Sequence, residues 1–458
     1  MSDLIITVSG LRGTIGETLT PDVAMRYASA FSHETAASGA FIITRDGRGS
    51  GKFIADAIHS ALNACGRSTI DAGVAATPTT GIIVRKLGAA GGLQITASHN
   101  PAQYNGIKLF SESGRVIPKT AGAAVLERYN SNATSWKKHD EIGNRSACLP
   151  DVFRQHLDAV LASVDADAIR AKNFKVVLDS NRGAGSTLGQ LLLAELRCRF
   201  EVIGATADGK FEHTPEPTEN NLTSICKEAC GFGADIVFCQ DPDADRLAII
   251  DAGGRYIGEE YTVAICAEHV LRTQCNGKHP SKRVKGALVI NYATSRMTED
   301  IAAKYGVQCH RSAVGEANVV DMMIDKNAAF GGEGNGGPID PKIGMVRDSF
   351  VGMAMLLDAM AAREATAAEL AGELPSYAIV KRKMQLPPEK IAKAIDKIET
   401  KIKGKSKSRL DGLRIEFDDA WLLVRASNTE PIVRTIAEAP TEAKANQLCD
   451  EAEAILGE

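Results

Sequence analysis

Three aspartates alternate along the segment DPDADR, residues 241–246. In a compact loop, Asp241, Asp243 and Asp245 can converge on one hard cation, and oxygen-only ligands favour Mg²⁺ or Ca²⁺ over zinc. An EF-hand is excluded because its loop requires glycine and glutamate where this chain has arginine and alanine. A solvent-facing acidic loop is the alternative, but three like charges after a buried strand are costly unless a cation compensates them. The pattern therefore predicts a magnesium site with open positions for a phosphate oxygen.

A serine and a histidine stand side by side in TASHNP, residues 96–101, after an apolar run. A hydrolase nucleophile elbow reads G-x-S-x-G between strand and helix, and this segment has neither the glycines nor a following helical pattern. Adjacent side chains of an extended segment point in opposite directions, so Ser98 and His99 are not expected to hydrogen-bond to each other. A phosphorylated Ser98 would carry about −1.5 to −2 charges and three acceptor oxygens, which a metal ion in the aspartate loop could bind. The alternative is that TASHNP is an ordinary polar turn, and the presence of the aspartate loop favours the phosphoserine.

Two further loops have the composition of anion and sugar sites. The segment RASNTEP, residues 425–431, combines a guanidinium fork with small donors, as phosphate-binding nests do. Its candidate residues are Arg425, Ser427, Asn428 and Thr429. The segment GGEGNGG, residues 331–337, places Glu333 and Asn335 among glycines that allow a close approach of the backbone to a ligand. Glutamate and asparagine suit vicinal sugar hydroxyls, and the alternative for both segments is an ordinary loop without a ligand.

The elements that position these loops follow an α/β pattern. Short β-branched runs alternate with longer amphipathic stretches, as in 41–48 followed by 51–66 and in 174–185 followed by 188–197. Near-continuous apolar strands are typical of parallel sheets covered by helices, and ligands gather at the carboxyl ends of such strands. A chain of 458 residues exceeds a single core, since cores stop growing at about 250–300 residues. The basic stretch 401–412 lacks periodicity, and we expect an exposed loop there.

Composition and charge exclude several classes of protein. The net charge of −4 has both signs interspersed, which argues against a nucleic-acid-binding protein. No apolar run approaches the roughly 18 residues that a membrane span requires, and the first residues do not resemble a signal peptide. The ten cysteines are scattered without a C-x-x-C pair, so we expect reduced thiols, a cytoplasmic location and no zinc.

Taken in order, TASHNP, DPDADR, GGEGNGG and RASNTEP resemble the four signature loops of the α-D-phosphohexomutase family. The resemblance covers the whole chain, including SGLRGTIGE, TRDGRGSG and VLDSNRGAG. It implies an α/β protein with three similar mixed α/β domains and a smaller C-terminal α+β domain around a central cleft. The expected domains are 1–150 with the phosphoserine, 151–253 with the metal loop, 254–370 with the sugar loop, and 371–458 with the phosphate-binding loop.

The resemblance also implies roles for individual residues. Ser98 would be the phosphoserine, and Mg²⁺ would be held by its phosphate and the three aspartates. Glu333 and Asn335 would contact sugar hydroxyls. The phosphate that is not being transferred would be clamped by Arg425, Ser427, Asn428 and Thr429. Arg12 and Lys108 match family positions near the reacting oxygens, and Arg246 follows the metal loop as in the family.

The implied reaction interconverts hexose 6-phosphates and hexose 1-phosphates through the phosphoserine and a hexose 1,6-bisphosphate intermediate. The expected partners are small sugar phosphates, without nucleic acid or membrane, and the sequence does not reveal the oligomeric state. The GEGNGG loop resembles the archaeal-type branch, which favours a phosphoglucosamine mutase over a phosphoglucomutase/phosphomannomutase. A Mg²⁺-dependent sugar-phosphate phosphatase and a non-catalytic sugar-phosphate binder are alternatives from other classes.

One departure from the family concerns proton transfer. Many bacterial members carry histidine at the end of the sugar loop, where this chain has Gly337. Proton transfer is therefore assigned to Lys108 and Arg12, with His310 as an outside candidate. Lys108 could accept a proton only if its pKa were lowered, and nearby carboxylates would oppose the lowering that Arg12 favours.

Overall fold

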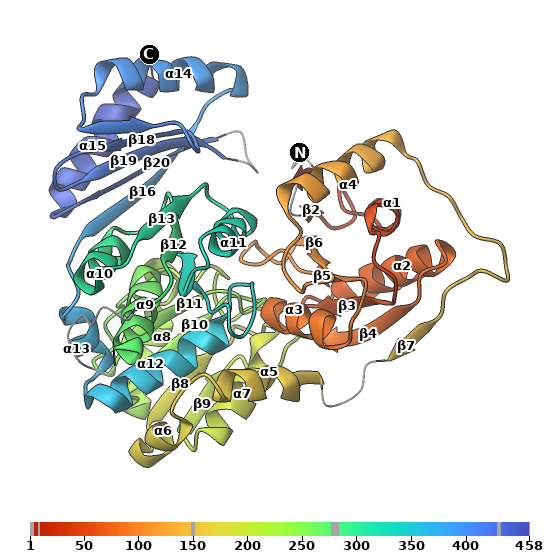
Figure 1. Cartoon of the computed structure of the whole chain (residues 1–458), viewed down its shortest axis with the longest axis horizontal. Helices are drawn as coiled ribbons and strands as arrows, with labels where there is room; N and C mark the ends of the chain where they lie inside the picture. Colours follow the sequence, from red (N-terminus) through yellow and green to blue (C-terminus); the bar gives the residue numbers. More distant parts are fainter. Residues whose placement is uncertain (1–3, 8–9, 148–151, 276–283, 428–431, 458) are drawn as a thin grey trace.

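The computed structural model describes residues 4–7, 10–147, 152–275, 284–427 and 432–457 (Figure 1). Within these ranges the chain forms four sheets, which contain seven, four, four and five strands. The first three sheets mix parallel and antiparallel pairs, whereas the fourth is antiparallel throughout. The predicted class, three mixed α/β domains followed by a smaller α+β domain, is confirmed. None of the helices in these ranges is long and apolar enough to cross a membrane.

The first sheet has the order β1-β2-β6-β5-β3-β4-β7. Its strands are β1 (Ile5–Thr7), β2 (Gly10–Thr14), β3 (Phe41–Arg45), β4 (Thr69–Val74), β5 (Gly91–Ile95), β6 (Tyr104–Ser111) and β7 (Arg145–Ala147). Its helices are α1 (Pro21–Glu34), α2 (Gly51–Ala64), α3 (Thr77–Lys86) and α4 (Lys119–Ser131). The central strands β3 and β5 are almost fully buried and parallel, so the loops that follow them emerge at one edge of the sheet.

The second sheet has the order β11-β10-β8-β9. Its strands are β8 (Lys175–Asp179), β9 (Arg199–Ile203), β10 (Ile236–Gln240) and β11 (Leu247–Asp251). Its helices are α5 (Val152–Leu161), α6 (Ala166–Lys172), α7 (Gly185–Glu195), the short η1 (Glu219–Asn221) and α8 (Thr223–Phe232). Every residue of β10 is buried, and the polar loop between the antiparallel pair β10 and β11 is the segment DPDADR.

The third sheet has the order β13-β12-β14-β15. Its strands are β12 (Leu288–Asn291), β13 (Cys309–Ser312), β14 (Phe330–Glu333) and β15 (Gly337–Ile339). Its helices are α9 (Glu259–Gln274), α10 (Met297–Tyr305), α11 (Glu316–Asp325), α12 (Ser349–Arg363) and α13 (Ala367–Gly372). The long helix α12 is buried over most of its length, and its side chains join those of the second domain in one continuous apolar core.

The fourth sheet has the order β16-β20-β19-β18-β17. Its strands are β16 (Ala378–Gln385), β17 (Ser406–Ser408), β18 (Leu413–Glu416), β19 (Trp421–Ala426) and β20 (Ile432–Ala439), with helices α14 (Pro388–Lys401) and α15 (Glu442–Leu456) on a separate core. The exposed loop expected over 401–412 is partly wrong, since its middle forms β17. Ser406–Ser408 pair antiparallel with Arg414–Glu416, and this pairing needs no apolar periodicity. In Figure 1 the four domains follow one another along an arc, with the fourth (blue) and the first (red to orange) at its ends.

Candidate active site

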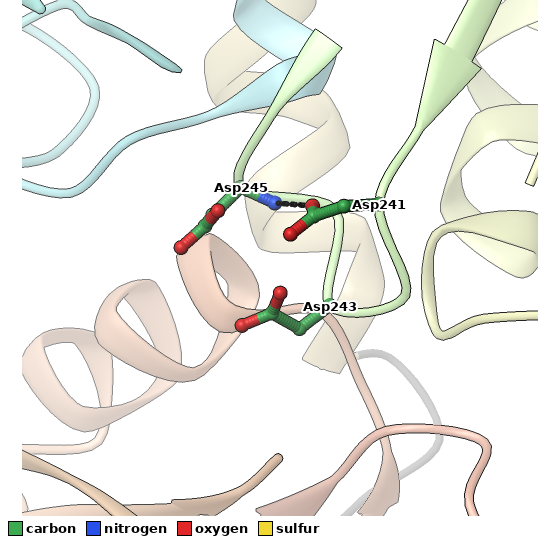
Figure 2. A group of neighbouring side chains, drawn as sticks. All are labelled: Asp241, Asp243 and Asp245. Carbon is green, nitrogen blue, oxygen red and sulfur yellow. Dashed lines mark hydrogen bonds between the residues drawn. The ribbon is translucent and has the colours of Figure 1, made fainter. Parts of the chain in front are cut away.

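The aspartate loop is closed by its own backbone. Asp241 Oδ1 accepts hydrogen bonds from the amides of Asp245 and Arg246, both at 3.1 Å. Ala244 takes a left-handed conformation, with φ +54°, and turns the chain back toward β11. The three aspartates are fully buried, and one carboxylate oxygen of each lies within 4.8 Å of the others (Figure 2). The sequence-predicted metal ligands are therefore brought together.

The carboxylates of this loop fit a magnesium ion. Among the described residues, Asp243 Oδ1 and Asp245 Oδ1 are buried and accept no hydrogen bond. A buried carboxylate oxygen without a partner is costly, and a hard cation is the ligand that such oxygens bind best. Burial and the two neighbouring carboxylates also raise the pKa of Asp241 well above its usual range. A divalent cation would relieve this repulsion.

Ser98 lies in the loop after β5 and reaches the aspartate loop. Its Oγ donates to Asp241 Oδ2 at 2.7 Å, across 143 residues of sequence. Arg48 holds this loop by donating to the carbonyl oxygens of Ser98, Asn100 and Pro101 at 2.6 to 2.8 Å. The serine is 1% exposed, so its hydroxyl is fixed at the edge of the metal loop.

The expectation that Ser98 and His99 could not hydrogen-bond is wrong. The serine has φ +48°, in the left-handed region, and the alternation of side chains that holds in extended backbone does not apply. Ser98 Oγ consequently lies 3.3 Å from His99 Nδ1. Burial, followed by the charges of Arg246 and Arg12, holds the pKa of His99 well below its usual range. The imidazole is therefore neutral, and the shorter hydrogen bond of the serine goes to Asp241.

Lys108 comes from β6 and bridges two of the aspartates. Its Nζ donates to Asp243 Oδ2 at 2.6 Å and to Asp245 Oδ2 at 2.7 Å. Burial alone would lower the pKa of Lys108, but the charges of Asp243 and Asp245 outweigh it and raise the pKa. The carboxylates thus prevail over burial and over the charge of Arg347, and the ammonium group stays charged.

Two arginines complete this side of the site. Arg12 in β2 donates from Nη1 to Asn100 Oδ1 at 3.1 Å. Burial and the positive charge of Arg246 lower the pKa of Arg12. Arg246 Nε lies 4.0 Å from Asp241 Oδ2 and 3.9 Å from Asp245 Oδ1. Both arginines therefore lie close to Ser98 or to the aspartates: Arg12 contacts the loop that carries Ser98, and Arg246 is near two of the aspartates.

The segment GGEGNGG, residues 331–337, is the sugar loop and connects β14 to β15. Its glutamate accepts hydrogen bonds from several donors. Glu333 Oε1 accepts from Asn291 Nδ2 at 2.7 Å and from the amide of Gly315 at 3.0 Å. Glu333 Oε2 accepts from Arg347 Nη1 at 2.8 Å. In the amide orientation that satisfies both of its polar atoms, Asn335 also accepts from Arg347 Nη1, at 2.8 Å. A carboxylate has about four lone-pair sites, so Glu333 retains acceptor capacity for a hydroxyl.

Arg347 is the functional residue that sequence reasoning missed. Its Nη2 donates to Asp245 Oδ2 at 2.6 Å, so that one guanidinium joins the metal loop to the sugar loop. Burial would lower the pKa of Arg347, but Asp245, Glu333 and other carboxylates raise it well above its usual range. In the sequence, Arg347 is marked only by its position one residue before Asp348, the N-cap of α12. An N-cap residue predicts the start of a helix but not the direction of the side chain that precedes it.

The end of the sugar loop is filled by the same arginine. A Cβ added to Gly337 would lie 2.3 Å from Arg347 Cδ and 2.8 Å from Arg347 Cγ. With Arg347 in this place, no side chain fits at position 337. Of the residues considered for proton transfer, His310 lies in β13, the edge strand of the third sheet.

The fourth loop follows β19. Arg425 is 6% exposed, and its Nε lies 3.1 Å from Asp411 Oδ2. The amide of Ser427 donates to the carbonyl oxygen of Ile432 at 2.9 Å. Asn428 and Thr429 lie outside the described residues. Among described residues, no hydrogen bond or ion pair joins Arg425 directly to Ser98, to the aspartates or to Glu333.

Comparisons with known proteins agree with this arrangement. Four sequence profiles described as phosphoglucomutase/phosphomannomutase domains match the chain in order. Alpha/beta/alpha domains I, II and III match residues 4–136, 154–254 and 259–377, and the C-terminal domain matches 377–455.

Relatives match over nearly the whole chain. A phosphoglucomutase/phosphomannomutase from Thermococcus kodakarensis is 37% identical over 446 residues, which cover 96% of this chain and 95% of that protein. A probable phosphoglucosamine mutase from Methanopyrus kandleri is 30% identical over 448 residues, covering 97% and 95%. The crystal structure of a phosphoglucomutase/phosphomannomutase family protein from Burkholderia thailandensis matches with a TM-score of 0.83 and 25% identity, covering 99% of this chain and 98% of that one. The chain belongs to the phosphoglucomutase/phosphomannomutase family, the α-D-phosphohexomutases.

Proposed function

We propose that this chain is a phosphohexomutase, an isomerase that interconverts hexose 1-phosphates and hexose 6-phosphates through phosphorylated Ser98. The observation that carries the proposal is the 2.7 Å hydrogen bond from Ser98 Oγ to Asp241 Oδ2. It puts a hydroxyl that can carry a phosphoryl group at the edge of a carboxylate cluster suited to a divalent cation. The membership of the chain in the phosphohexomutase family supports the same reaction.

Each half-reaction is an exchange of one phosphoryl group. The bond between Ser98 Oγ and phosphorus breaks, a bond from phosphorus to a sugar hydroxyl oxygen forms, and the hydroxyl proton is returned to the serine. The product is a hexose 1,6-bisphosphate, and the reverse exchange at its other end restores phosphoserine. Such a transfer depends on positioning and charge neutralisation.

The residues around Ser98 supply both. Mg²⁺ would be held by Asp241, Asp243, Asp245 and the serine phosphate, and it would neutralise charge on the transferring group. Lys108, with its raised pKa, keeps its proton and serves as a fixed positive charge rather than as a base. Arg246 adds positive charge, and Arg12, whose pKa is lowered by burial and by Arg246, is the other residue considered for proton transfer.

The remaining loops would hold the sugar. Glu333 and Asn335 are proposed to contact the hydroxyls, with Arg347 and Asn291 fixing the carboxylate. Arg425, Ser427, Asn428 and Thr429 are proposed to clamp the phosphate that is not being transferred. Among the hexoses we place glucosamine first, because the GEGNGG loop resembles that of archaeal-type members. Glucose and mannose are the alternatives. One relative is named a phosphoglucomutase/phosphomannomutase and another a probable phosphoglucosamine mutase.

A coupled assay with the 1-phosphates of glucose, mannose and glucosamine tests the proposal. We expect formation of a 6-phosphate that requires Mg²⁺ and is stimulated by the matching 1,6-bisphosphate. Ser98→Ala should lower kcat by at least about 10³-fold, since it removes the phosphoryl carrier. Release of inorganic phosphate as the main product would instead identify a phosphatase.

Intact mass spectrometry separates a mutase from a sugar-phosphate binder. Incubation with glucose 1,6-bisphosphate should add one phosphoryl group to the wild-type chain and none to Ser98→Ala. Ser50→Ala, which changes another loop serine of the first domain, is the matched control and should still accept the group. A wild-type chain that never gains a phosphoryl group would favour the binder.

A further inference from the structure

Two consecutive backbone amides near the sugar loop donate to carboxylates from two different domains. The amide of Gly315 donates to Glu333 Oε1 at 3.0 Å, within the third domain. The amide of Val314 donates to Asp411 Oδ2 at 2.9 Å, and Asp411 belongs to the fourth domain. Gly315 has φ +121°, which only glycine adopts readily, and this conformation turns the two amides toward different acceptors.

The oxygen of Asp411 that accepts from Val314 also faces Arg425. Asp411 Oδ2 lies 3.1 Å from Arg425 Nε, and the two side chains are 18% and 8% exposed. Within the described residues, Arg425 Nε and Nη2 are both buried without a hydrogen bond, so the contact of Nε with Asp411 is an ion pair. The carboxylate therefore holds the guanidinium at its Nε side and leaves Nη2 available for a phosphate oxygen.

The turn that carries Asp411 is built against the same arginine. Gly412 has φ +72°, and a Cβ there would lie 2.3 Å from the carbonyl oxygen of Val424 and 2.7 Å from Arg425 Cβ. This close approach sets Asp411 directly beside β19. The carboxylate is thereby placed next to Arg425.

Other contacts hold the fourth domain against the third. Tyr292 Oη and Ser408 Oγ are 2.6 Å apart, the amide of Arg296 donates to Glu438 Oε1 at 3.0 Å, and Lys381 Nζ donates to Glu259 Oε1 at 2.9 Å. Loss of the Asp411 carboxylate should therefore leave the domains docked. Its effect should be confined to the orientation of Arg425 and of the Val314–Gly315 backbone.

We propose that Asp411 is a positioning residue that orients the Arg425 guanidinium for the substrate phosphate and ties it to the backbone that holds Glu333. The proposal rests on the proposed phosphohexomutase function. It links phosphate recognition in the fourth domain to sugar recognition in the third through Asp411, Val314 and Gly315. A second reading gives Asp411 the opposite effect, because a carboxylate beside Arg425 also lowers the positive potential that attracts phosphate.

Steady-state kinetics of Asp411→Asn distinguishes the two. We expect KM for the hexose 1-phosphate and the inhibition constant for inorganic phosphate to rise about tenfold, with kcat changed less than about threefold. Arg425→Lys should raise KM to a similar or greater extent. The double variant should be no worse than Arg425→Lys alone, because Asp411 acts through Arg425.

Asp418→Asn is the matched control. Asp418 lies at the opposite end of β18 and is 91% exposed, and its variant should keep the wild-type KM. Asp411→Ser is a second variant in case the asparagine protein does not fold. A lowered or unchanged KM in a folded Asp411 variant, or additive effects with Arg425→Lys, would overturn the proposal. A wild-type chain that isomerises no hexose phosphate would instead refute the proposed function.

Discussion

At the scale of residues, opposite charges alternate through the buried site. Lys108 lies between Asp243 and Asp245, and Arg347 lies between Asp245 and Glu333. Each carboxylate oxygen engaged in this way is oriented before a ligand arrives, and preorganised charges of this kind lower the barrier to phosphoryl transfer. Removal of one partner leaves a buried charge uncompensated, at a cost of about 3–5 kcal/mol. The site therefore depends on two positively charged side chains, Lys108 and Arg347, that lie outside the four signature loops.

Replacement of Arg347 tests this dependence. Arg347→Lys keeps the charge but loses the planar fork that reaches Asp245 and Glu333 together. We expect kcat/KM to fall about 10²-fold, and the Mg²⁺ concentration for half-maximal activity to rise, because Asp245 loses a positioning donor. Titration of activity with Mg²⁺ measures both values. Arg255→Lys is the control, since Arg255 is 67% exposed, and an equal loss there would contradict a specific role for Arg347.

At the scale of elements, the sequence predicted the loops better than what surrounds them. DPDADR and TASHNP could be placed because each follows a buried apolar strand, and the carboxyl ends of such strands gather ligands. Arg347 could not be placed, since its partners are up to 102 residues away and no local pattern encodes a side-chain direction. The contact between Ser98 and His99 was missed because the left-handed φ of Ser98 has no sequence signature here. The strand β17 was missed because its residues are polar and pair at a sheet edge.

A buried histidine of α2, which contacts β4, makes the stability of the first domain pH-dependent. His59 Nδ1 lies 2.7 Å from Thr69 Oγ1. Burial, assisted by the charge of Arg145 and opposed by Asp71, lowers the pKa of His59 to about 4. The unfolded histidine protonates near pH 6.5, as an exposed imidazole does. Between these values the unfolded state binds more protons, so this residue lowers stability as the pH falls from about 6.5 to about 4.

His59→Gln should flatten that dependence, since glutamine can still bond Thr69 but does not titrate. Thermal melting at pH 7.5 and pH 4.5 measures the effect. We expect the difference in Tm between the two pH values to be smaller in the variant than in the wild type. His139→Gln, at an exposed position, should retain the wild-type difference. An unchanged difference in His59→Gln would show that His59 does not contribute.

At the scale of the whole molecule, the first three domains meet at one buried histidine. His156 in α5 lies between Thr79 of α3 and Asp348, the residue that caps α12. The distances are 2.9 Å from His156 Nδ1 to Thr79 Oγ1 and 2.7 Å from His156 Nε2 to Asp348 Oδ2. Because Arg347 precedes Asp348, the junction also anchors the segment that joins the metal loop to the sugar loop. The arc of domains in Figure 1 is thus fixed at a point close in sequence to the site.

Removal of this side chain should weaken the junction. His156→Ala leaves Asp348 Oδ2 without its donor and opens a cavity against the ring of Phe350, whose edge-on contact with His156 has a centroid distance of 5.4 Å. The unpaired carboxylate and the cavity together should lower the free energy of unfolding by about 2–5 kcal/mol. Urea unfolding measures the loss, and His139→Ala is the control at an exposed site, where a change within about 0.5 kcal/mol is expected.

The slope of the transition with urea is informative too, because the second and third domains share one core and should unfold together. If His156→Ala detaches the first domain alone, a second transition should appear, and only the later one should report the shared core.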